Sequence, residues 1–584
     1  MGTISDKLMR IINTKEDIRQ ALISKGYDVP TSIPFKEYAK MILDLPCKVD
    51  SFPDIEGIVA RYSASGLTNE QMAANPVWVD KTGNGHDIQL KNFSWKGMPG
   101  VGGYEMNFNL WRNNVSSIPD ISMSTTTTSV SVSVGNSTYN NNLIYIHISN
   151  WDINKNHWLK VTSTYEDGDL AFIFYNDSNT KKIGLPANGY VNILAYPEFK
   201  GSYMYISTIS NKQGSFTIEQ LPLYPGALVF DGVDDYGVCE NFPILTKEKG
   251  YTVVVLRQWD QDFLNTTLTG GLLSTRNYST GEGVAFEKIE SSNKGYWNLG
   301  AGGIIDFAKS PFTWQTSKQY NNVGILKGDK NHGKPLCVGC GLSGGQQCGR
   351  FAIWELVFLD HDATEEELTK IKDYFVKTYP WLFPDKAWTV TGKTNEDEDR
   401  ATIANITGNG NDLVLSNFGF AEGSGYNEEG EYAGYLVTDG VDDEIISSIF
   451  KMGNDWTVIG DWELINTGKN DNAGIVKFDS IVIYNYNYNY NSMLINIKNG
   501  RNILIPDQNT VNAICSDGRI YSKDWKESIY NEETESTSKN FLTIGYSGNA
   551  YTKIAFKNLA IYPTVLSRED CIKAYNYLQT LKAK

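Results

Sequence analysis

Basic residues are scarce in this sequence relative to acidic ones. Its 584 residues include 52 Lys and Arg against 68 Asp and Glu, which gives a net charge of −16 at pH 7. A nucleic-acid binder needs a positively charged face, and no basic patch is visible here. The composition therefore argues against nucleic acid as a partner.

Long apolar runs are also missing. No stretch approaches the roughly 18 consecutive apolar residues of a membrane-spanning helix, so we expect no membrane insertion. Residues 1–7 carry no apolar export segment, so we expect no signal peptide and synthesis in the cytosol. The cysteines number seven, and an odd count without an export signal indicates reduced thiols rather than a disulfide framework.

Recognisable catalytic motifs are absent as well. No nucleophile elbow, phosphate-binding loop or His-Glu metal motif occurs. A retaining glycosidase needs two carboxyls roughly 5 Å apart, which alternate residues of one strand would supply. The acidic run at 396–399 follows a turn, and its repeat counterpart at 70–73 keeps a single carboxylate. We therefore interpret this run as a solvated loop and predict that the chain is not an enzyme.

Three cysteines lie close together in the sequence: Cys337, Cys340 and Cys348. A structural zinc site would need a fourth ligand, and the nearest histidines are His332 and His361. The competing interpretation is a glycine-rich strand pair that buries small thiols, because cysteine commonly serves as a small core residue. The incomplete ligand set favours the second interpretation.

Aromatic residues and glycine are abundant, with 34 Tyr, 24 Phe, 14 Trp and 53 Gly. This composition favours short strands and turns, so we predict a mainly β protein. The phrase Phe-Asp-Gly-Val-Asp-Asp at 230–235 indicates a strand, a tight turn at Gly232 and a second strand. Nearly the same phrase, Thr-Asp-Gly-Val-Asp-Asp, recurs at 438–443. The chain therefore contains an internal repeat.

Further blocks recur in the same order and locate an insertion. Gly-x-Thr-Asn-Glu stands at 66–70 and at 392–396, and Thr-Gly-Asn-Gly-x-Asp stands at 82–87 and at 407–412. The spacing between copies is much longer for these early blocks than for the acidic turns. We therefore predict two β-sandwiches, 55–105 plus 226–384 and 385–584, with a further β-sandwich at 106–225 inserted in a loop of the first.

The first 50 residues have helical character. Two short amphipathic helices cannot bury a self-sufficient core, so they must dock elsewhere. They are either a packed hairpin or an attachment module, and we favour the attachment module. The apolar positions expected to form this anchor are Ile11, Ile18, Leu22, Phe35, Tyr38 and Ile42.

The aspartates of the two repeated phrases are the weak candidates for metal ligands. Carboxylate oxygens suit calcium, but aspartates also shape turns without any ion. We favour the turn-shaping role and expect no cofactor, with calcium as the open alternative. The candidates are Asp231, Asp234 and Asp235 in the first copy and Asp439, Asp442 and Asp443 in the second.

A Tyr-Asn alternation occupies residues 484–491. As a strand it places four tyrosines on one face, where they would either pack on the core or offer flat surfaces to sugars or another subunit. We favour core packing because half-buried strands accept tyrosine well. The candidate glycan or subunit contacts are Tyr484, Tyr486, Tyr488 and Tyr490.

The phrases Asp-x-Thr-Gly-Asn-Gly-x-Asp at 80–87 and Phe-Asp-Gly-Val-Asp-Asp-Tyr at 230–236, followed by a Ser/Thr-capped acidic helix, resemble those of concanavalin A-like, laminin-G-type jelly rolls. The resemblance covers roughly two thirds of the chain, in two copies, and implies two antiparallel sheets packed face to face. The second copy departs from the pattern slightly, with Thr438 for Phe230 and Glu444 for Tyr236.

The whole layout is similar to that of virion fibre or decoration proteins of crAss-like Bacteroidales bacteriophages. This resemblance implies a head or tail fibre, located in the virion and made in the host cytoplasm. Its expected partners are other virion proteins through the N-terminal helices, further copies of itself as a trimer or dimer, and host surface polysaccharide. The alternatives are a polysaccharide-degrading enzyme of the glucanase jelly-roll type and a host cell-surface lectin.

Overall fold

The computed structural model describes residue 15, residues 52–104 and, with internal gaps, residues 112–306, 335–465 and 474–583. This part of the chain forms six β-sheets and only short helices, so the expected mainly β architecture is confirmed. Within it, every helix is too short or too polar to cross a bilayer. The anchor positions Ile11, Ile18, Leu22, Phe35, Tyr38 and Ile42 lie outside the described residues.

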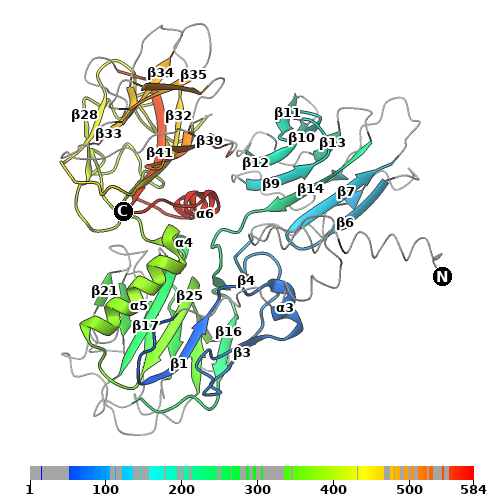
Figure 1. Cartoon of the computed structure of the whole chain (residues 1–584), viewed down its shortest axis with the longest axis vertical. Helices are drawn as coiled ribbons and strands as arrows, with labels where there is room; N and C mark the ends of the chain where they lie inside the picture. Colours follow the sequence, from blue (N-terminus) through cyan, green and yellow to red (C-terminus); the bar gives the residue numbers. More distant parts are fainter. Residues whose placement is uncertain are drawn as a thin grey trace.

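Two sheets combine strands from both sides of the segment 106–225 (Figure 1). The smaller sheet contains β1 (Ile58–Ser63), β4 (Gly100–Val101), β15 (Leu228–Asp231), β17 (Thr252–Trp259) and β25 (Arg350–Leu359). The larger sheet contains β2 (Val77–Trp78), β3 (Ile88–Lys91), β16 (Tyr236–Cys239), β18 (Gly270–Ser274), β19 (Ala285–Lys288), β20 (Lys294–Trp297), β21 (Ile304–Asp306), β22 (Leu336–Val338), β23 (Cys340–Leu342) and β24 (Gln346–Cys348).

An apolar core lies between these two sheets, built by period-two alternation. On β3 the residues alternate between buried and exposed, which places Ile88 and Leu90 in the core. They share it with Val255 and Phe358 from the smaller sheet. Because β3 contributes every second residue to this core, its alternating sequence pattern fixes which of its faces is inside.

Two further five-stranded sheets are made entirely from residues 112–220. One contains β5 (Arg112–Asn113), β8 (Ile146–His147), β10 (Leu170–Asn176), β11 (Asn179–Leu185) and β13 (Tyr203–Thr208). The other contains β6 (Ile121–Thr125), β7 (Ser129–Val134), β9 (His157–Ser163), β12 (Asn188–Ile193) and β14 (Gly214–Gln220). A separate core lies between them and includes Val132, Leu159 and Phe172.

The last two sheets are made from residues 386–562, with eight strands each. One contains β26 (Lys386–Thr389), β29 (Gly425–Asn427), β30 (Tyr435–Val437), β32 (Thr457–Leu464), β37 (Val511–Cys515), β38 (Arg519–Ser522), β39 (Glu527–Ile529) and β41 (Ile554–Tyr562). The other contains β27 (Thr402–Ile403), β28 (Leu413–Ser416), β31 (Glu444–Ser447), β33 (Gly474–Phe478), β34 (Ile481–Tyr486), β35 (Ser492–Ile497), β36 (Arg501–Ile505) and β40 (Leu542–Ile544). Their shared core includes Trp388, Val458 and Phe556.

The strand pairing shows how the two copies correspond. In the first copy Glu355 of β25 lies opposite Ser63 and Leu256, and the β17 register shifts directly after Leu256. In the second copy Asn558 of β41 lies opposite Thr389 and Asp461, and the β32 register shifts directly after Asp461. Glu355 and Asn558 therefore occupy the same position beside the same bulge.

The described helices are α3 (Asn69–Ala74), α4 (Gln261–Leu264), α5 (Glu365–Thr378), the 3₁₀ turn η4 (Pro380–Leu382) and α6 (Arg568–Gln579). Helix α5 follows β25 and α6 follows β41, so each copy ends in the same strand–helix unit. The Thr364 side chain caps α5, and the Glu367 side chain accepts from the Thr364 amide in return, which forms a capping box.

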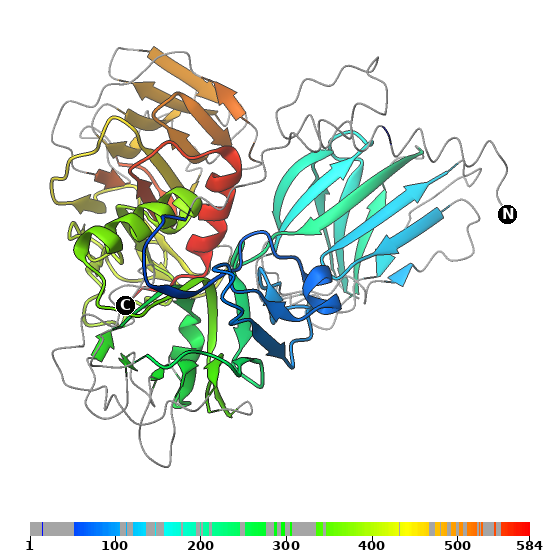
Figure 2. The same ribbon diagram turned by 60° about the horizontal axis from the view of Figure 1, so that its bottom comes forward.

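Helix α6 lies where the three groups of sheets meet (Figures 1 and 2). Its Tyr577 ring stands 6.2 Å from Trp354 of β25, and its Tyr575 ring stands 4.9 Å from Trp158 of β9. Tyr562 of β41 also donates a buried hydrogen bond to the backbone oxygen of Trp381, 3.0 Å away. A continuous apolar core therefore joins the two copies through α5, η4 and α6.

Candidate functional site

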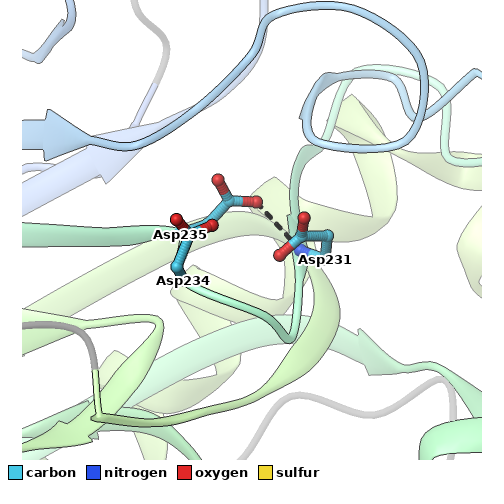
Figure 3. A group of neighbouring side chains, drawn as sticks. All are labelled: Asp231, Asp234 and Asp235. Carbon is cyan, nitrogen blue, oxygen red and sulfur yellow. Dashed lines mark hydrogen bonds between the residues drawn. The ribbon is translucent and has the colours of Figure 1, made fainter.

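The first acidic turn, residues 231–235, connects β15 to β16 and is held by its own aspartates (Figure 3). The Val233 amide donates to Asp231 Oδ1 at 2.8 Å, and the Asp231 amide donates to Asp235 Oδ2 at 3.0 Å. Gly232 has φ 78°, and a Cβ there would lie 3.1 Å from the Arg350 backbone nitrogen. The turn therefore needs glycine at this position and a carboxylate at each end.

The second acidic turn, residues 439–443, repeats this arrangement between β30 and β31. The Val441 amide donates to Asp439 Oδ1 at 2.7 Å, and the Asp439 amide donates to Asp443 Oδ2 at 2.7 Å. Gly440 has φ 75° and packs against the Lys553 backbone. The turn-shaping role that we expected for these aspartates is therefore present in both copies.

In each copy an asparagine side chain bonds the backbone of a neighbouring loop and holds it beside the acidic turn. Asn69 Oδ1 accepts from the Val101 amide, and Asn395 Oδ1 accepts from the Tyr426 amide, both at 2.8 Å. Each Nδ2 donates to the backbone oxygen of the same residue. The repeated Thr-Asn-Glu block revealed these asparagines as a repeat, but no sequence signal indicated that they clamp a distant loop.

The residue two positions before the clamped residue, Val101 or Tyr426, differs between the copies. In the second copy Ser424 donates from Oγ to Asp443 Oδ1 at 3.1 Å. The same register places Pro99 at the corresponding position of the first copy, where no hydroxyl is available. Asp235 Oδ1 is buried and has no hydrogen-bond partner among the described residues. Sequence analysis did not identify Ser424, because a single serine in a loop carries no pattern.

The innermost carboxyls of the two turns, Asp235 and Asp443, also differ in pKa. Burial, with a smaller contribution from the negative charges of Asp231 and Asp234, raises the pKa of Asp235 to about 8. Burial also raises the pKa of Asp443, to about 6, and this rise is opposed by hydrogen bonds from the Asp439 amide and the Ser424 hydroxyl, which stabilise the charged form. Near neutral pH Asp235 therefore holds its proton while Asp443 is mainly ionised.

Each acidic turn also has the spacing of a cation site. One carboxylate oxygen from each of its three aspartates lies within 4.8 Å of the other two. Hard oxygen ligands of this kind suit calcium or magnesium rather than zinc. The residues that could hold a metal are therefore the same ones that shape the turns.

The three neighbouring cysteines lie together in the first copy. Cys340 and Cys348 are direct partners across β23 and β24, and Cys337 joins them in a small apolar cluster with Val238. All three are buried and reduced. Within the described residues they do not form a metal-ligating trio, because the candidate groups found there are the two sets of aspartates. This arrangement fits the interpretation of small thiols in a strand pair.

The acidic run at 396–399 lies in a loop, as expected, but it is locally bonded. Asp397 accepts from the Thr394 amide at 2.9 Å, and Asp399 pairs with the ammonium of Lys393 at 2.6 Å. These two carboxylates therefore stabilise the loop that carries the Asn395 clamp.

The tyrosine row is described only in part. Tyr484 and Tyr486 belong to β34, while Tyr488 and Tyr490 lie outside the described residues. The choice between core packing and a glycan or subunit contact stays a prediction.

No family model matches the chain, and no curated protein matches it. Among solved structures, it is similar to the Botulinum neurotoxin serotype D binding domain, at 12% identity and TM-score 0.23, over 60% of this chain and 89% of that one. It is also similar to Trypanosoma rangeli sialidase in complex with sialic acid, at 8% identity and TM-score 0.24, over 80% of this chain and 85% of that one. Such low TM-scores carry no argument about function.

Proposed function

We propose that the chain is a structural, non-enzymatic component of a bacteriophage virion, a head or tail fibre or decoration protein that displays β-sandwich modules. In this proposal, residues 55–105 plus 226–384 and residues 385–584 are two laminin-G-type sandwiches. Residues 106–225 are an inserted sandwich, and residues 1–50 attach the chain to other virion proteins.

The observation that carries the proposal is the continuous core that joins the sheets. Trp354 and Tyr577 belong to different copies, and Trp158 contacts Tyr575 from the segment between 106 and 225. Such packing holds the three modules in one fixed arrangement, which supports a structural role.

The distribution of carboxylates supports a structural role over hydrolysis. The aspartate trios shape turns, and the buried Glu355 pairs with Arg61 at 3.3 Å instead of facing solvent. A retaining glycosidase would need two such groups on either side of a bound sugar. We therefore place host surface polysaccharide among the ligands to be bound and not among the substrates.

The direct test is to locate the chain in purified phage particles. Mass spectrometry of gradient-purified virions should find it in stoichiometric amounts, and antibody labelling should place it on the head or the tail. A variant lacking residues 1–50 should be absent from particles while keeping the melting temperature of the full chain. Particles that lack the intact protein would refute the proposal.

A further inference from the structure

The cysteines of β22, β23 and β24 form a cluster of three thiols whose chemistry the proposed structural role does not use. We propose that Cys340 and Cys348 form a disulfide bond when the chain meets a small disulfide oxidant, and that Cys337 is the thiol through which this bond is exchanged. The proposal concerns this cluster alone and holds whether or not the chain is a virion component.

The strand register places Cys340 and Cys348 where a cross-strand disulfide can close. The two residues are direct antiparallel partners on β23 and β24. The next pair along carries a ladder bond, since the Gly349 amide donates to the Gly339 oxygen at 3.0 Å. Bonded and non-bonded pairs alternate along such a ladder, so the two cysteines form a non-hydrogen-bonded pair, with Cα atoms roughly 4.5 Å apart. Disulfides span about 4.4–6.8 Å between Cα atoms, so the bond needs no large movement of either strand.

Cys337 lies against this pair on the outer face of the larger sheet. It is the direct partner of Val238 across β22 and β16, and Val238 joins the three cysteines in one apolar cluster. Its neighbours Leu336 and Val338 belong instead to the core between the two sheets. Because successive residues of a strand point to opposite faces, the thiols lie on the side of the sheet away from that core.

Side chains that reach solvent border the cluster. Tyr236 is only partly buried and packs against it. The ammonium of the exposed Lys91 stands 5.8 Å from the centre of the Tyr236 ring. Cys348 itself keeps 6% of its surface exposed. A small oxidant therefore reaches the thiols without crossing the core of the sandwich.

Cys337 is the thiol best prepared to react. A hydrogen bond with the Cys340 thiol lowers the pKa of Cys337 below that of an ordinary cysteine. The positive charge of Lys91 acts in the same direction, while burial and the negative charge of Glu240 oppose it. The thiolate is the nucleophile in disulfide exchange, so we expect Cys337 to attack the oxidant first.

The reaction balances with oxidised glutathione as the electron acceptor. The Cys337 thiolate attacks one glutathione sulfur, which forms a mixed disulfide and releases the first glutathione thiolate. Cys340 then attacks Cys337 Sγ and displaces the second glutathione. Cys348 finally attacks Cys340 Sγ and displaces Cys337, which is again a free thiol. In sum, two protein thiols lose two protons and two electrons, and one oxidised glutathione becomes two reduced molecules.

The test is differential alkylation of the full chain. The reduced protein is freed of reductant and incubated with oxidised glutathione. Its free thiols are then blocked with N-ethylmaleimide in denaturant, and the remaining cysteines are reduced and labelled with iodoacetamide. All three cysteines lie in the tryptic peptide 331–350, so fragment spectra assign the label at each position. We expect iodoacetamide label on Cys340 and Cys348 and N-ethylmaleimide on Cys337.

Serine variants separate the two roles. Cys348→Ser should stop the sequence one step earlier and move the iodoacetamide label to Cys337 and Cys340. Cys337→Ser should still give the bond between Cys340 and Cys348, but at least tenfold more slowly. Cys515→Ser removes a buried thiol of the second copy and is the matched control, which should change neither product nor rate.

The melting temperature of each variant under reducing conditions shows whether it is folded. N-ethylmaleimide on Cys340 or Cys348 of the oxidised parent chain would overturn the proposed bond. Bond formation at the parent rate in Cys337→Ser would overturn the proposed exchange role.

Discussion

Each copy buries a polar side chain at the same strand position, but the two side chains differ in their polar partners. Glu355 on β25 is paired with Arg61 and accepts a 2.7 Å hydrogen bond from the Tyr379 hydroxyl. Asn558 on β41 is fully buried, and neither atom of its amide has a hydrogen-bond partner among the described residues. Arg61 has no basic counterpart, because the equivalent residue on β26 is Ala387.

This comparison separates the features that both copies share from those in which they differ. The bulge, the strand register and the following helix are kept in both copies, because they determine how β25 and β41 pack. The polar partners under the helix are free to change, provided that each buried charge keeps an opposite charge. An asparagine can be buried unpaired at moderate cost, whereas a glutamate cannot.

The largest expected effect comes from removing the cation of the first copy. Arg61→Met leaves Glu355 buried without its ion-pair partner, which should destabilise the first sandwich by about 3–5 kcal/mol. A thermal unfolding scan of the full chain should show the loss. The double variant Arg61→Met with Glu355→Gln should recover part of it, and an unchanged melting temperature for the single variant would contradict the ion-pair account.

A smaller and opposite effect is expected at the matching position of the second copy. Asn558→Leu replaces a buried, unpaired amide with an apolar side chain of similar size, and should stabilise by about 1–3 kcal/mol. The same scan measures it, with Asn427→Leu on β29, a partly exposed site, as a control for added apolar surface. A loss of stability in Asn558→Leu would mean that the amide is satisfied after all.

The acidic turns differ in how stability depends on pH. Both Asp235 and Asp443 have folded-state pKa values raised above the ordinary value, so the folded state holds their protons more tightly than the unfolded state does. Their contribution to stability is therefore greatest at low pH. It falls from about pH 4 until about pH 8 for Asp235, and only until about pH 6 for Asp443.

Asp235→Asn should remove the upper part of this dependence. It should stabilise the chain by about 1–2 kcal/mol at pH 8 and have little effect near pH 4, since an amide carries no charge to bury. Asp443→Asn should stabilise less at pH 8, because Ser424 already supports the charged form. Melting temperatures measured from pH 4 to pH 9 distinguish the two, and identical profiles would refute the assigned role of Ser424.

The sequence predicted the repeated elements well and their differences poorly. Gly232 and Gly440 recur with their flanking aspartates, so the turns were visible as a pattern, and the Thr364 cap follows from its place before three glutamates. The sequence did not indicate which residues from distant parts of the chain contact these turns. Ser424 reaches Asp443 only because Asn395 clamps its loop, and a contact between residues so far apart leaves no local signal.

The same limit applies to the packing between the copies. Tyr575 and Tyr577 belong to the same helix and contact different groups of sheets, through Trp158 and Trp354 respectively. Helical periodicity predicts that α6 has an apolar face but not what covers it. The sequence therefore indicated separate β units, and the shared core between them emerged only in three dimensions.

The smallest expected effect concerns the caps of the equivalent helices α5 and α6. At α5, Thr364 and Glu367 form a reciprocal cap, in which the Thr364 amide donates to the Glu367 carboxylate at 2.7 Å. At α6, Ser567 Oγ accepts from the Asp570 amide at 3.1 Å and donates to the Asp570 carboxylate. Thr364→Ala should cost about 1 kcal/mol. Ser567→Ala should cost somewhat less in direct cap bonds, but any fraying of α6 would expose Tyr575 and Tyr577. Hydrogen exchange of the α5 and α6 amides separates the two effects. If Ser567→Ala reduces protection beyond the first turn of α6, whereas Thr364→Ala affects only the first turn of α5, then the packing of α6, and not its cap, holds the copies together.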